Sequence, residues 1–194
     1  MNAPLLFLLE RVETPLGEML VITDESGRLR ALDWKDYEED MHRLMRRHYR
    51  DTRIDLQETR DMSPATQAVL SYFDGELSSI DRLEVATGGT AFQREVWAAL
   101  REIPAGQTIS YLELAKRVGR PAAVRAVGMA NGANPISIVV PCHRVIGSNA
   151  RLIGYGGGLQ RKRWLLQHEH ATPATAASQI ATLPGFETLS VPTP

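Results

Sequence analysis

Hydrophobic and polar residues alternate early in the chain with the two-residue period of a β-strand. Residues 19–22 are apolar, residues 24–27 (Asp-Glu-Ser-Gly) are typical of a turn, and Leu29 and Ala31 alternate with arginines. This order predicts a β-hairpin.

The pattern then changes to the period of an α-helix. Residues 36–50 place apolar side chains on one helix face, and a second helix is predicted for residues 64–73, before Gly75. The residues at helical spacing in the first of these are Met41, Leu44, Met45 and His48. The first half of the chain is therefore predicted to be an acidic unit of strands and helices, and no chemical motif stands out in it.

Three further helices are predicted after the Gly88-Gly89 pair, each with a start signal. The signals are Thr90 before residues 91–103, Ser110 with Glu113 before a helix that ends at Gly119, and Pro121 at the start of residues 122–131. The last two helices, joined by residues 119–121, are typical of a helix-turn-helix.

The rest of the chain is predicted to hold a strand, a loop, a helix and a tail. Residues 136–140 form an apolar run that Pro141 ends, which favours a short strand. Residues 154–158 are a glycine-rich loop that leads into a helix at residues 160–168. We expect an α+β protein with an N-terminal α/β domain (1–85), a mostly helical C-terminal domain (86–170) and a flexible tail (171–194).

Composition excludes several classes of protein. With 194 residues, 43% of them hydrophobic and 23% charged, the chain is neither wholly disordered nor collagen-like. The apolar run at residues 5–9 is too short for a signal peptide or a membrane span. One cysteine allows neither an intrachain disulfide nor a multi-cysteine zinc site, so we expect a cytoplasmic protein.

Charge is divided unevenly along the chain. Residues 1–85 carry 11 basic and 18 acidic residues, a balance of −7, whereas residues 86–170 carry 11 basic and 4 acidic residues, a balance of +7. The basic half suggests a surface for a polyanion. From charge alone, solvated arginines and lysines on ordinary helices explain it equally well.

Cys142 in the run Cys142-His143-Arg144 is the best candidate for chemistry. A thiolate is a strong nucleophile, and a neighbouring imidazole or cation lowers its pKa. The alternative is an inert core cysteine, which is the commoner role of a lone cysteine after an apolar segment. The glycine loop lacks the third glycine of a dinucleotide fingerprint, and His42 and His48 have the wrong spacing for a metal site.

Small side chains dominate residues 122–132, with Arg125 as the one long side chain in the middle. Small residues allow a helix to approach another surface closely. That surface is either the core of the protein or a nucleic-acid groove, and Arg125 favours the groove.

Several of these motifs together resemble the O6-alkylguanine-DNA alkyltransferases, and in particular the bacterial constitutive type. The residues that carry the resemblance are Thr14-Pro15-Leu16-Gly17, residues 86–90, Thr90-x-Phe92-Gln93-x-x-Val96-Trp97, Tyr111, Arg125-Ala126-Val127-Gly128, Asn134-Pro135, residues 141–145, Gly154-Tyr155 and residues 165–169. The resemblance is dense over residues 86–170 and looser in the N-terminal half, where it implies a ribonuclease H-like domain.

The resemblance implies a DNA repair protein that moves the alkyl group of O6-alkylguanine, or of O4-alkylthymine, irreversibly onto Cys142. It implies a single turnover, no cofactor, and a monomer that flips the damaged base out of double-stranded DNA. Some members of the family hold a zinc in the N-terminal domain through cysteines and histidines; the chain lacks those cysteines, so we expect no metal. It further implies that Glu169 orients His143, that His143 takes the thiol proton through a water, and that Asn134 holds the turn that carries the cysteine.

The same resemblance implies two sets of binding residues. The substrate residues are Tyr111, Val145, Tyr155, Gly156 and Gly157. The DNA residues, which would lie at the minor groove, are Ala123, Arg125, Ala126, Gly128 and Lys162.

Two other functions compete with this one. A non-catalytic alkyltransferase-like protein would bind the lesion without chemistry, but such proteins replace the cysteine that is present here as Cys142. A cysteine hydrolase would need a histidine far away in the sequence and an oxyanion hole.

Overall fold

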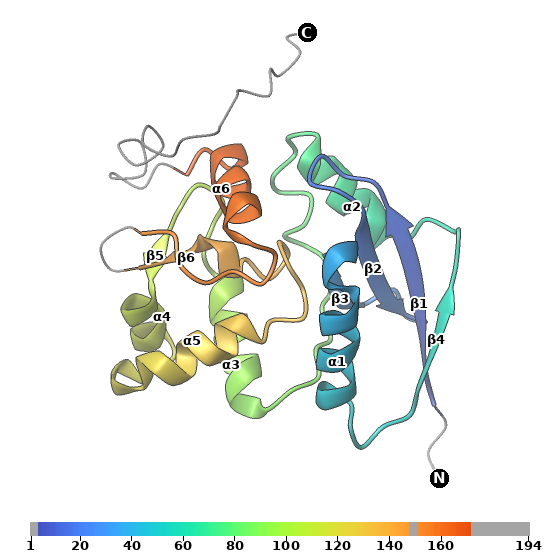
Figure 1. The fold of residues 1–194 in the computed structure, drawn as a ribbon, viewed down its shortest axis with the longest axis horizontal. Helices are drawn as coiled ribbons and strands as arrows, with labels where there is room; N and C mark the ends of the chain where they lie inside the picture. Colours follow the sequence, from blue (N-terminus) through green and yellow to red (C-terminus); the bar gives the residue numbers. More distant parts are fainter. Residues whose placement is uncertain (1–3, 148–150, 172–194) are drawn as a thin grey trace, which may run out of the picture.

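A computed structural model describes residues 4–147 and 151–171 of the chain. Figure 1 shows a sheet layer on one side and a group of helices on the other. We call residues 4–87 the N-terminal half and residues 88–171 the C-terminal half. The sheet has the order β3-β2-β1-β4, in which β1 is antiparallel to β2, β2 is antiparallel to β3, and β1 is parallel to β4. Its strands are β1 (Leu5–Val12), β2 (Met19–Asp24), β3 (Leu29–Trp34) and β4 (Ile54–Glu58).

Both faces of this sheet are covered, which explains why every residue of β2 is buried. Alternate residues of a strand point to opposite faces. Leu20 and Ile22 pack with Met41 and Met45 of α1 (Glu38–His48), which follows the 3₁₀ turn η1 (Lys35–Tyr37). The opposite face packs against α2 (Pro64–Phe73) and against the C-terminal half, and these residues form one continuous core.

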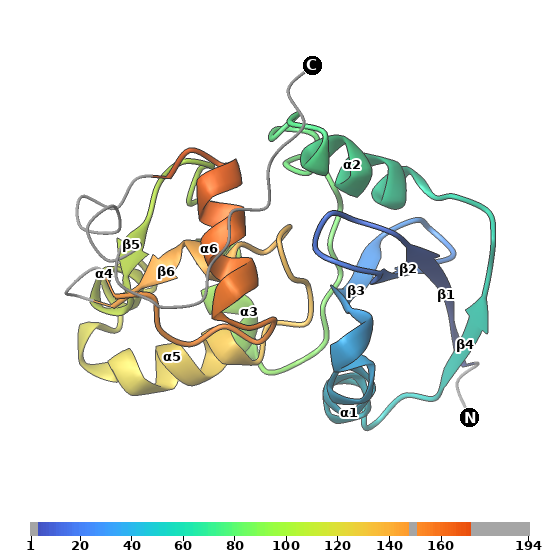
Figure 2. The same cartoon turned by 45° about the horizontal axis from the view of Figure 1, so that its top comes forward.

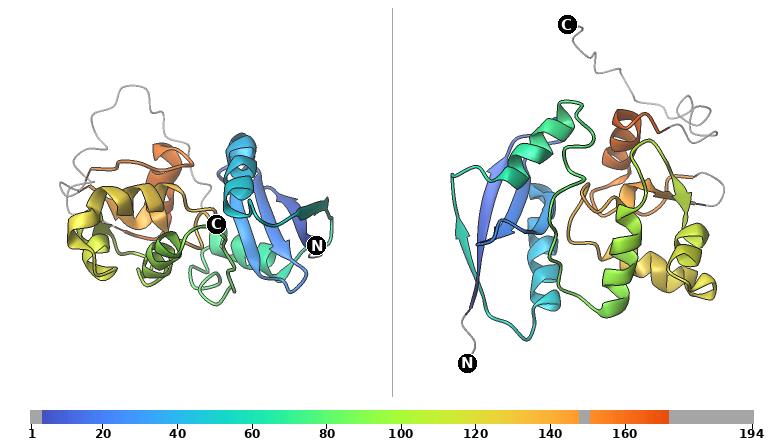
Figure 3. Two further views of the ribbon diagram at one scale, coloured as in Figure 1. Left: turned by 90° about the horizontal axis from the view of Figure 1, so that it is seen from below. Right: turned by 180° about the vertical axis from the view of Figure 1, so that it is seen from behind.

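Figures 2 and 3 show the C-terminal half as a helical group beside the sheet. Its helices are α3 (Ala91–Arg101), α4 (Tyr111–Arg117), α5 (Val124–Gly132) and α6 (Leu159–His168). Two short strands, β5 (Ile109–Ser110) and β6 (Val145–Ile146), pair in parallel, and 3₁₀ turns lie at η2 (Pro121–Ala123) and η3 (Cys142–Arg144).

The predicted helix starts are confirmed. Thr90 and Gln93 form a complete capping box at α3, and the Ser110 side chain accepts the Glu113 N–H at α4. Pro121 opens the turn before α5. The predicted hairpin is confirmed as β2 and β3, whereas β1 and β4 were not predicted.

The strand predicted for residues 136–140 is wrong. The Val139 N–H donates to Ser137 O at 2.8 Å and the Val140 N–H donates to Ile136 O at 3.1 Å, so the segment bonds to itself in turns. Ile138 has a φ of 70°, which no strand adopts. Only an isolated bridge joins Ile136 to Leu32 of β3. The segment is apolar because it is buried between the two halves and not because it is extended.

The predicted tail begins at Ala171, which is buried against Leu166 and Ile146. Its other residues, 172–194, lie outside the described part of the chain. None of the helices in the described ranges combines the length and the apolarity that crossing a membrane requires.

Candidate active site

Cys142 lies at the start of the 3₁₀ turn η3, directly after Pro141. The Cys142 N–H donates to Val140 O at 2.8 Å and the Arg144 N–H donates to Pro141 O at 3.0 Å, so the chain reverses tightly here. Cys142 is 7% exposed. The turn therefore presents the thiol at the edge of the core that the two halves share.

Asn134 fastens this turn. Its side-chain Nδ2 donates to Val140 O at 2.8 Å and lies 3.2 Å from Cys142 Sγ, while its Oδ1 accepts the Ile136 N–H at 3.0 Å. One buried amide thus connects two points of the chain before the cysteine, Ile136 and Val140, to the sulfur itself. This arrangement agrees with the role that the sequence suggested for Asn134.

Burial raises the pKa of the Cys142 thiol to about 11, because a thiolate loses its hydration in the core. The hydrogen bond from Asn134 and the charge of Lys162 oppose this rise, and the nearby Asp33 adds to it. The resting form at neutral pH is therefore the thiol, so a reaction at this sulfur needs a group that removes its proton.

His143 is buried and its ring is oriented by Glu169. His143 Nε2 lies 2.9 Å from Glu169 Oε1, and His143 Nδ1 is buried without a hydrogen bond to any described protein atom. Burial lowers the pKa of His143 and outweighs the opposing charge of Glu169. A neutral ring that donates from Nε2 to Glu169 keeps Nδ1 free to accept a proton.

Glu169 also accepts hydrogen bonds from two other side chains. Arg144 donates from Nε to Oε2 at 2.9 Å and from Nη2 to Oε1 at 2.7 Å, and the Tyr72 hydroxyl donates to Oε1 at 2.8 Å. Burial alone would raise the pKa of Glu169, but His143 and Arg144 hold it well below its usual range. The carboxylate therefore remains charged beside the imidazole.

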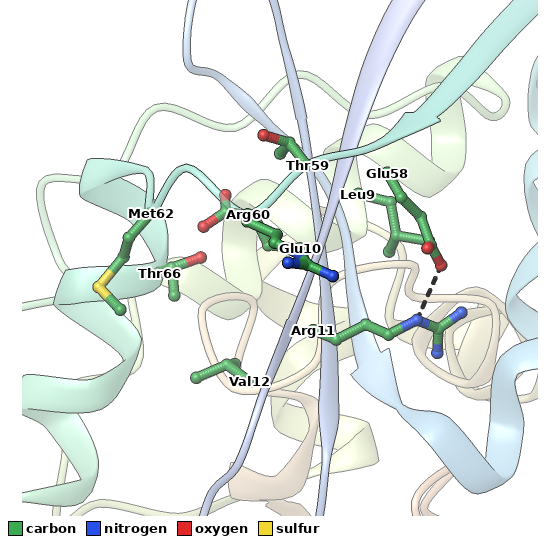
Figure 4. A pocket seen from close by; sticks show the side chains of 9 residues that line it. All are labelled: Leu9, Glu10, Arg11, Val12, Glu58, Thr59, Arg60, Met62 and Thr66. Carbon is green, nitrogen blue, oxygen red and sulfur yellow. Dashed lines mark hydrogen bonds and ion pairs between the residues drawn. The ribbon is translucent and has the colours of Figure 1, made fainter.

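A pocket of about 270 Å³ opens in front of the thiol. The C-terminal half contributes Asn131, Asn134, Ser137, Cys142 and Gly156 to its walls, and the N-terminal half contributes Asp33 and residues of η1 and α1. Figure 4 shows a larger pocket of about 410 Å³ on the sheet, between β1, the end of β4 and the start of α2. Its walls hold no nucleophile of the thiol or imidazole kind, so the pocket at Cys142 is the candidate reactive site.

The described residues hold no group of three or more His, Cys, Asp or Glu side chains placed for a metal ion. The site holds a buried thiol at Cys142 and, in the next residue, an imidazole that is bonded to the carboxylate of Glu169. These are the residue types from which an activated nucleophile is built.

Comparison with known proteins identifies the family. Residues 9–87 match the model for the 6-O-methylguanine DNA methyltransferase, ribonuclease-like domain, and residues 91–171 match the model for the DNA binding domain of the same family. The methylated-DNA--protein-cysteine methyltransferase of Salmonella typhimurium is 55% identical over 160 residues, which cover 82% of this chain and 94% of that protein. The chain belongs to the 6-O-methylguanine DNA methyltransferase family.

More distant members of this methyltransferase family agree. The protein of the same name from Methanosarcina acetivorans is 43% identical over 157 residues, covering 81% of this chain and 94% of that protein. The crystal structure of Mycobacterium tuberculosis O6-methylguanine methyltransferase matches with a TM-score of 0.68 and 36% identity, over 89% of this chain and 99% of that one. A crystal structure of Mycobacterium tuberculosis OGT in complex with DNA matches with a TM-score of 0.65 and 34% identity, over 84% and 92% of the two chains.

Three of the residues that the methyltransferase resemblance assigns to the substrate, Tyr111, Tyr155 and Gly156, lie near Cys142. Burial raises the pKa values of Tyr111 and Tyr155, and the charge of Cys142 raises them further, which places both phenols within the electrostatic reach of the sulfur. Val145 is buried in β6, and Gly156 lines the pocket. Gly157 is buried against the Trp34 ring instead. Their contacts with a base remain predictions.

Four of the five predicted DNA residues lie on η2 and α5, and the fifth, Lys162, lies on α6. Arg125 and Ala126 are exposed, and Ala123 and Gly128 are partly buried. The opposite face of α5 is buried, where Trp97 Nε1 donates to Ala130 O at 2.9 Å. The small residues thus pack into the core on one face of α5 and leave mostly short side chains on the other.

Lys162 is a correction to the predicted DNA residues. Its side chain is completely buried, and Nζ donates to Val145 O at 2.6 Å, Ile153 O at 2.8 Å and Gly154 O at 3.3 Å. All three ammonium hydrogens are used inside the protein, so Lys162 cannot contact a phosphate. Burial lowers its pKa to about 8, and its charge favours the Cys142 thiolate.

Three site residues were missed by the sequence analysis: Asp33, Tyr72 and Arg144. Asp33 and Tyr72 come from the N-terminal half, where no motif marked them. Arg144 was noted only as a neighbour of the cysteine, and nothing local showed that its guanidinium would bind Glu169. Long-range packing alone brings these groups to the site.

Proposed function

We propose that this protein repairs DNA by moving the alkyl group of O6-alkylguanine, or of O4-alkylthymine, onto its own Cys142. The observation that carries the proposal is the buried thiol at the pocket, held by Asn134 and followed by the His143 and Glu169 pair. The names of the relatives, methylated-DNA--protein-cysteine methyltransferase, support the same reaction.

In the proposed reaction, His143 Nδ1 removes the thiol proton through a bridging water, and Glu169 stabilises the imidazolium that forms. The sulfur attacks the alkyl carbon, a sulfur–carbon bond forms, and the bond between that carbon and O6 breaks. The electron pair of the broken bond leaves with guanine, which then takes up a proton. A thioether has no easy reversal, so each chain reacts once.

The substrate is proposed to be a base that has left the duplex. A thiol in a closed pocket cannot reach O6 within stacked DNA, and extrusion of one nucleotide costs a few kcal/mol. The exposed face of α5 is proposed to lie in the minor groove, with Arg125 filling the gap in the stack. Tyr111 is proposed to support the flipped nucleotide and to donate to the base, and Tyr155, Val145, Gly156 and Gly157 to border the pocket.

The protein is proposed to act on double-stranded DNA as a monomer in the cytoplasm, where a lone cysteine stays reduced. Sequence-independent repair needs no readout of base edges, which suits a helix face of small side chains. The alternative is a protein that binds the lesion and transfers no alkyl group, and the presence of Cys142 at the pocket disfavours it.

Mass spectrometry of the protein after incubation with DNA that contains O6-methylguanine tests the proposal. We expect the Cys142 peptide to gain the mass of one CH₂ group and the yield to stop at one group per chain. Cys142→Ala should bind the same DNA and gain no mass. Several turnovers per chain, or an unmodified Cys142 peptide after the DNA has been repaired, would refute it.

A further inference from the structure

Arg161 joins the two halves of the protein beside the pocket. It lies on α6, three residues after Gly158, and its guanidinium binds both carboxylate oxygens of Asp36, at 2.8 and 3.0 Å. Nε and Nη2 also donate to Leu16 O, each at 3.2 Å. The guanidinium carbon lies 4.8 Å from the centre of the Trp34 ring. We call Arg161, Asp36 and Trp34 the Arg161 cluster.

The Arg161 cluster also holds the glycine loop. Arg161 Nη1 donates to Gly157 O at 3.3 Å, and Gly157 packs so closely on Trp34 that a Cβ atom there would lie 2.6 Å from Trp34 Cζ3. The next residue toward the N-terminus, Gly156, lines the Cys142 pocket. The loop at the rim of the pocket is thus fastened from outside, by groups that do not touch the thiol.

A fastening of this kind matters because the loop has three glycines in succession. Glycine loses more conformational freedom on ordering than any other residue, so an unattached loop would have to be ordered by the substrate itself. A planar guanidinium with fixed donors limits the conformations of its partners better than an ammonium does. The hydrogen bond from Arg161 lowers the pKa of Asp36, so the ion pair persists at neutral pH.

We propose that Arg161 is a positioning residue for alkyl transfer, which orders residues 156–158 at the rim of the pocket by tying them to the N-terminal sheet. This role rests on the proposed function, because the loop matters only if a base enters the pocket. Arg161 acts through Gly157 and does not contact the reacting atoms. Because Arg161 is paired with Asp36, it is also not free to contact DNA phosphates.

Benzyl transfer from the free base O6-benzylguanine tests this role without DNA. The rate of Cys142 modification is measured over a range of base concentrations, which separates the half-saturating concentration from the maximal rate. For Arg161→Gln we expect the half-saturating concentration to rise about tenfold, equivalent to 1.4 kcal/mol. The maximal rate should stay within about twofold, because the bound state is still the ordered one. The final yield should remain one benzyl group per chain.

Two variants control for charge and for folding. Arg163→Gln removes the same charge from the same helix, at a side chain for which the described residues provide no ion pair, and should leave both constants unchanged. Asp36→Asn changes an exposed carboxylate and, like Arg161→Gln, should raise the half-saturating concentration. The double variant Asp36→Asn with Arg161→Gln should be no worse than Arg161→Gln alone, because the two groups act as one contact.

The outcomes separate this inference from the proposed function. A wild-type protein that takes no methyl group at Cys142 from DNA that contains O6-methylguanine would overturn the proposed function. A wild-type protein that reacts, beside Arg161→Gln and Asp36→Asn variants with unchanged half-saturating concentrations, would overturn only the role of Arg161. A lower thermal stability without a change in that constant would give Arg161 a purely structural role.

Discussion

Glu169 interacts with three side chains that lie at least 25 positions away from it in the sequence: Tyr72, His143 and Arg144. Its charge has two separate effects. It supports a positive imidazole when the thiol proton is removed, and it neutralises an arginine that is 3% exposed. Removing that charge should therefore change both the chemistry and the stability.

Glu169→Gln should move the pH profile of Cys142 alkylation upward, because the imidazolium loses its counter-charge and the thiol pKa rises. The free energy of unfolding should fall by about 3–5 kcal/mol, since Arg144 becomes an unpaired buried charge. The folded-state pKa of Glu169 is below its usual value, so this stability is present above the usual pKa and is lost as pH falls toward the folded-state pKa. Rate measurements against pH and urea unfolding at several pH values check these effects.

Tyr72→Phe is the matched control for Glu169→Gln. It removes one hydrogen bond from the charged carboxylate and leaves both charges, so it should lower the free energy of unfolding by about 1.5–3 kcal/mol and leave the pH profile in place. A Glu169→Gln protein with the wild-type profile would show that another group activates the thiol.

Asp33→Asn should lower the pKa of the Cys142 thiol, whereas Glu169→Gln should raise it. Burial raises the pKa of Asp33 to about 6, and once ionised its charge raises the pKa of Cys142. The variant should therefore alkylate faster than the wild type above about pH 6, with a profile shifted downward. Asp40→Asn, at an exposed carboxylate that also lines the pocket, should change little. A profile that moves upward in Asp33→Asn would contradict the assignment.

At the scale of elements, α5 has two faces with different tasks. Val127 and Ala130 are buried, while Arg125 is exposed and makes no ion pair with the described residues. Met129, one turn after Arg125, is 72% exposed. The exposed face can be changed without loss of the core that the other face builds.

Arg125→Ala should slow repair in duplex DNA by about one to two orders of magnitude, since unstacking costs a few kcal/mol and each 1.4 kcal/mol is a factor of ten. The reaction with free O6-benzylguanine should keep its rate, because no duplex is opened. Arg117→Ala, an exposed arginine on α4, controls for charge when both are measured at saturating DNA. Equal losses on both substrates would give Arg125 a role in the fold.

The glycine loop offers two neighbouring positions with different surroundings. A Cβ at Gly156 would meet nothing within 4 Å, whereas one at Gly157 would lie 2.6 Å from the Trp34 ring. Gly156→Ser should leave the free energy of unfolding within about 0.5 kcal/mol and lower the ratio of benzyl to methyl transfer by narrowing the entrance.

Gly157→Ser introduces the same side chain and should cost about 1–3 kcal/mol through overpacking. Denaturant curves measure the free energy of unfolding of both variants, and the rates of benzyl and methyl transfer measure their size preference. An unchanged benzyl-to-methyl ratio in Gly156→Ser would mean that size preference is set elsewhere in the pocket.

At the scale of the whole molecule, the basic half presents less positive charge than its balance of +7 suggests. Arg144 and Lys162 are buried and bonded, and Arg161 is paired with Asp36. Exposed cations such as Lys116 and Arg125 remain for phosphates. The salt dependence of DNA binding depends on such exposed charges and not on the sequence total.

The core that the two halves share predicts cooperative unfolding. Residues of β2, β3, α2, α3, α5 and α6 belong to one buried cluster, so neither half can lose its packing alone. We expect urea unfolding followed by tryptophan fluorescence and by far-UV circular dichroism to give one midpoint. Trp34 reports on the sheet, and Trp97 and Trp164 report on the helices. Two separated transitions would show that the halves unfold independently.

The sequence by itself determined the features that depend on residues close together in the chain. Thr90 and Ser110 marked the starts of α3 and α4 correctly, because a cap bonds to backbone groups two or three residues away. Pro121 marked the 3₁₀ turn that precedes α5. The run around Cys142 marked a candidate nucleophile, and the resemblance to the alkyltransferases, which rests on short local motifs, then assigned the reaction to it.

Only the tertiary structure decided which side chains the core would cover and which distant groups would meet. Lys162 became an internal donor, Asp33 and Tyr72 reached the site from the other half, and residues 136–140 turned instead of extending. Burial depends on the packing of segments more than a hundred residues apart, and in a low-dielectric interior that packing also sets pKa values. No local pattern of apolar and polar residues carries that information.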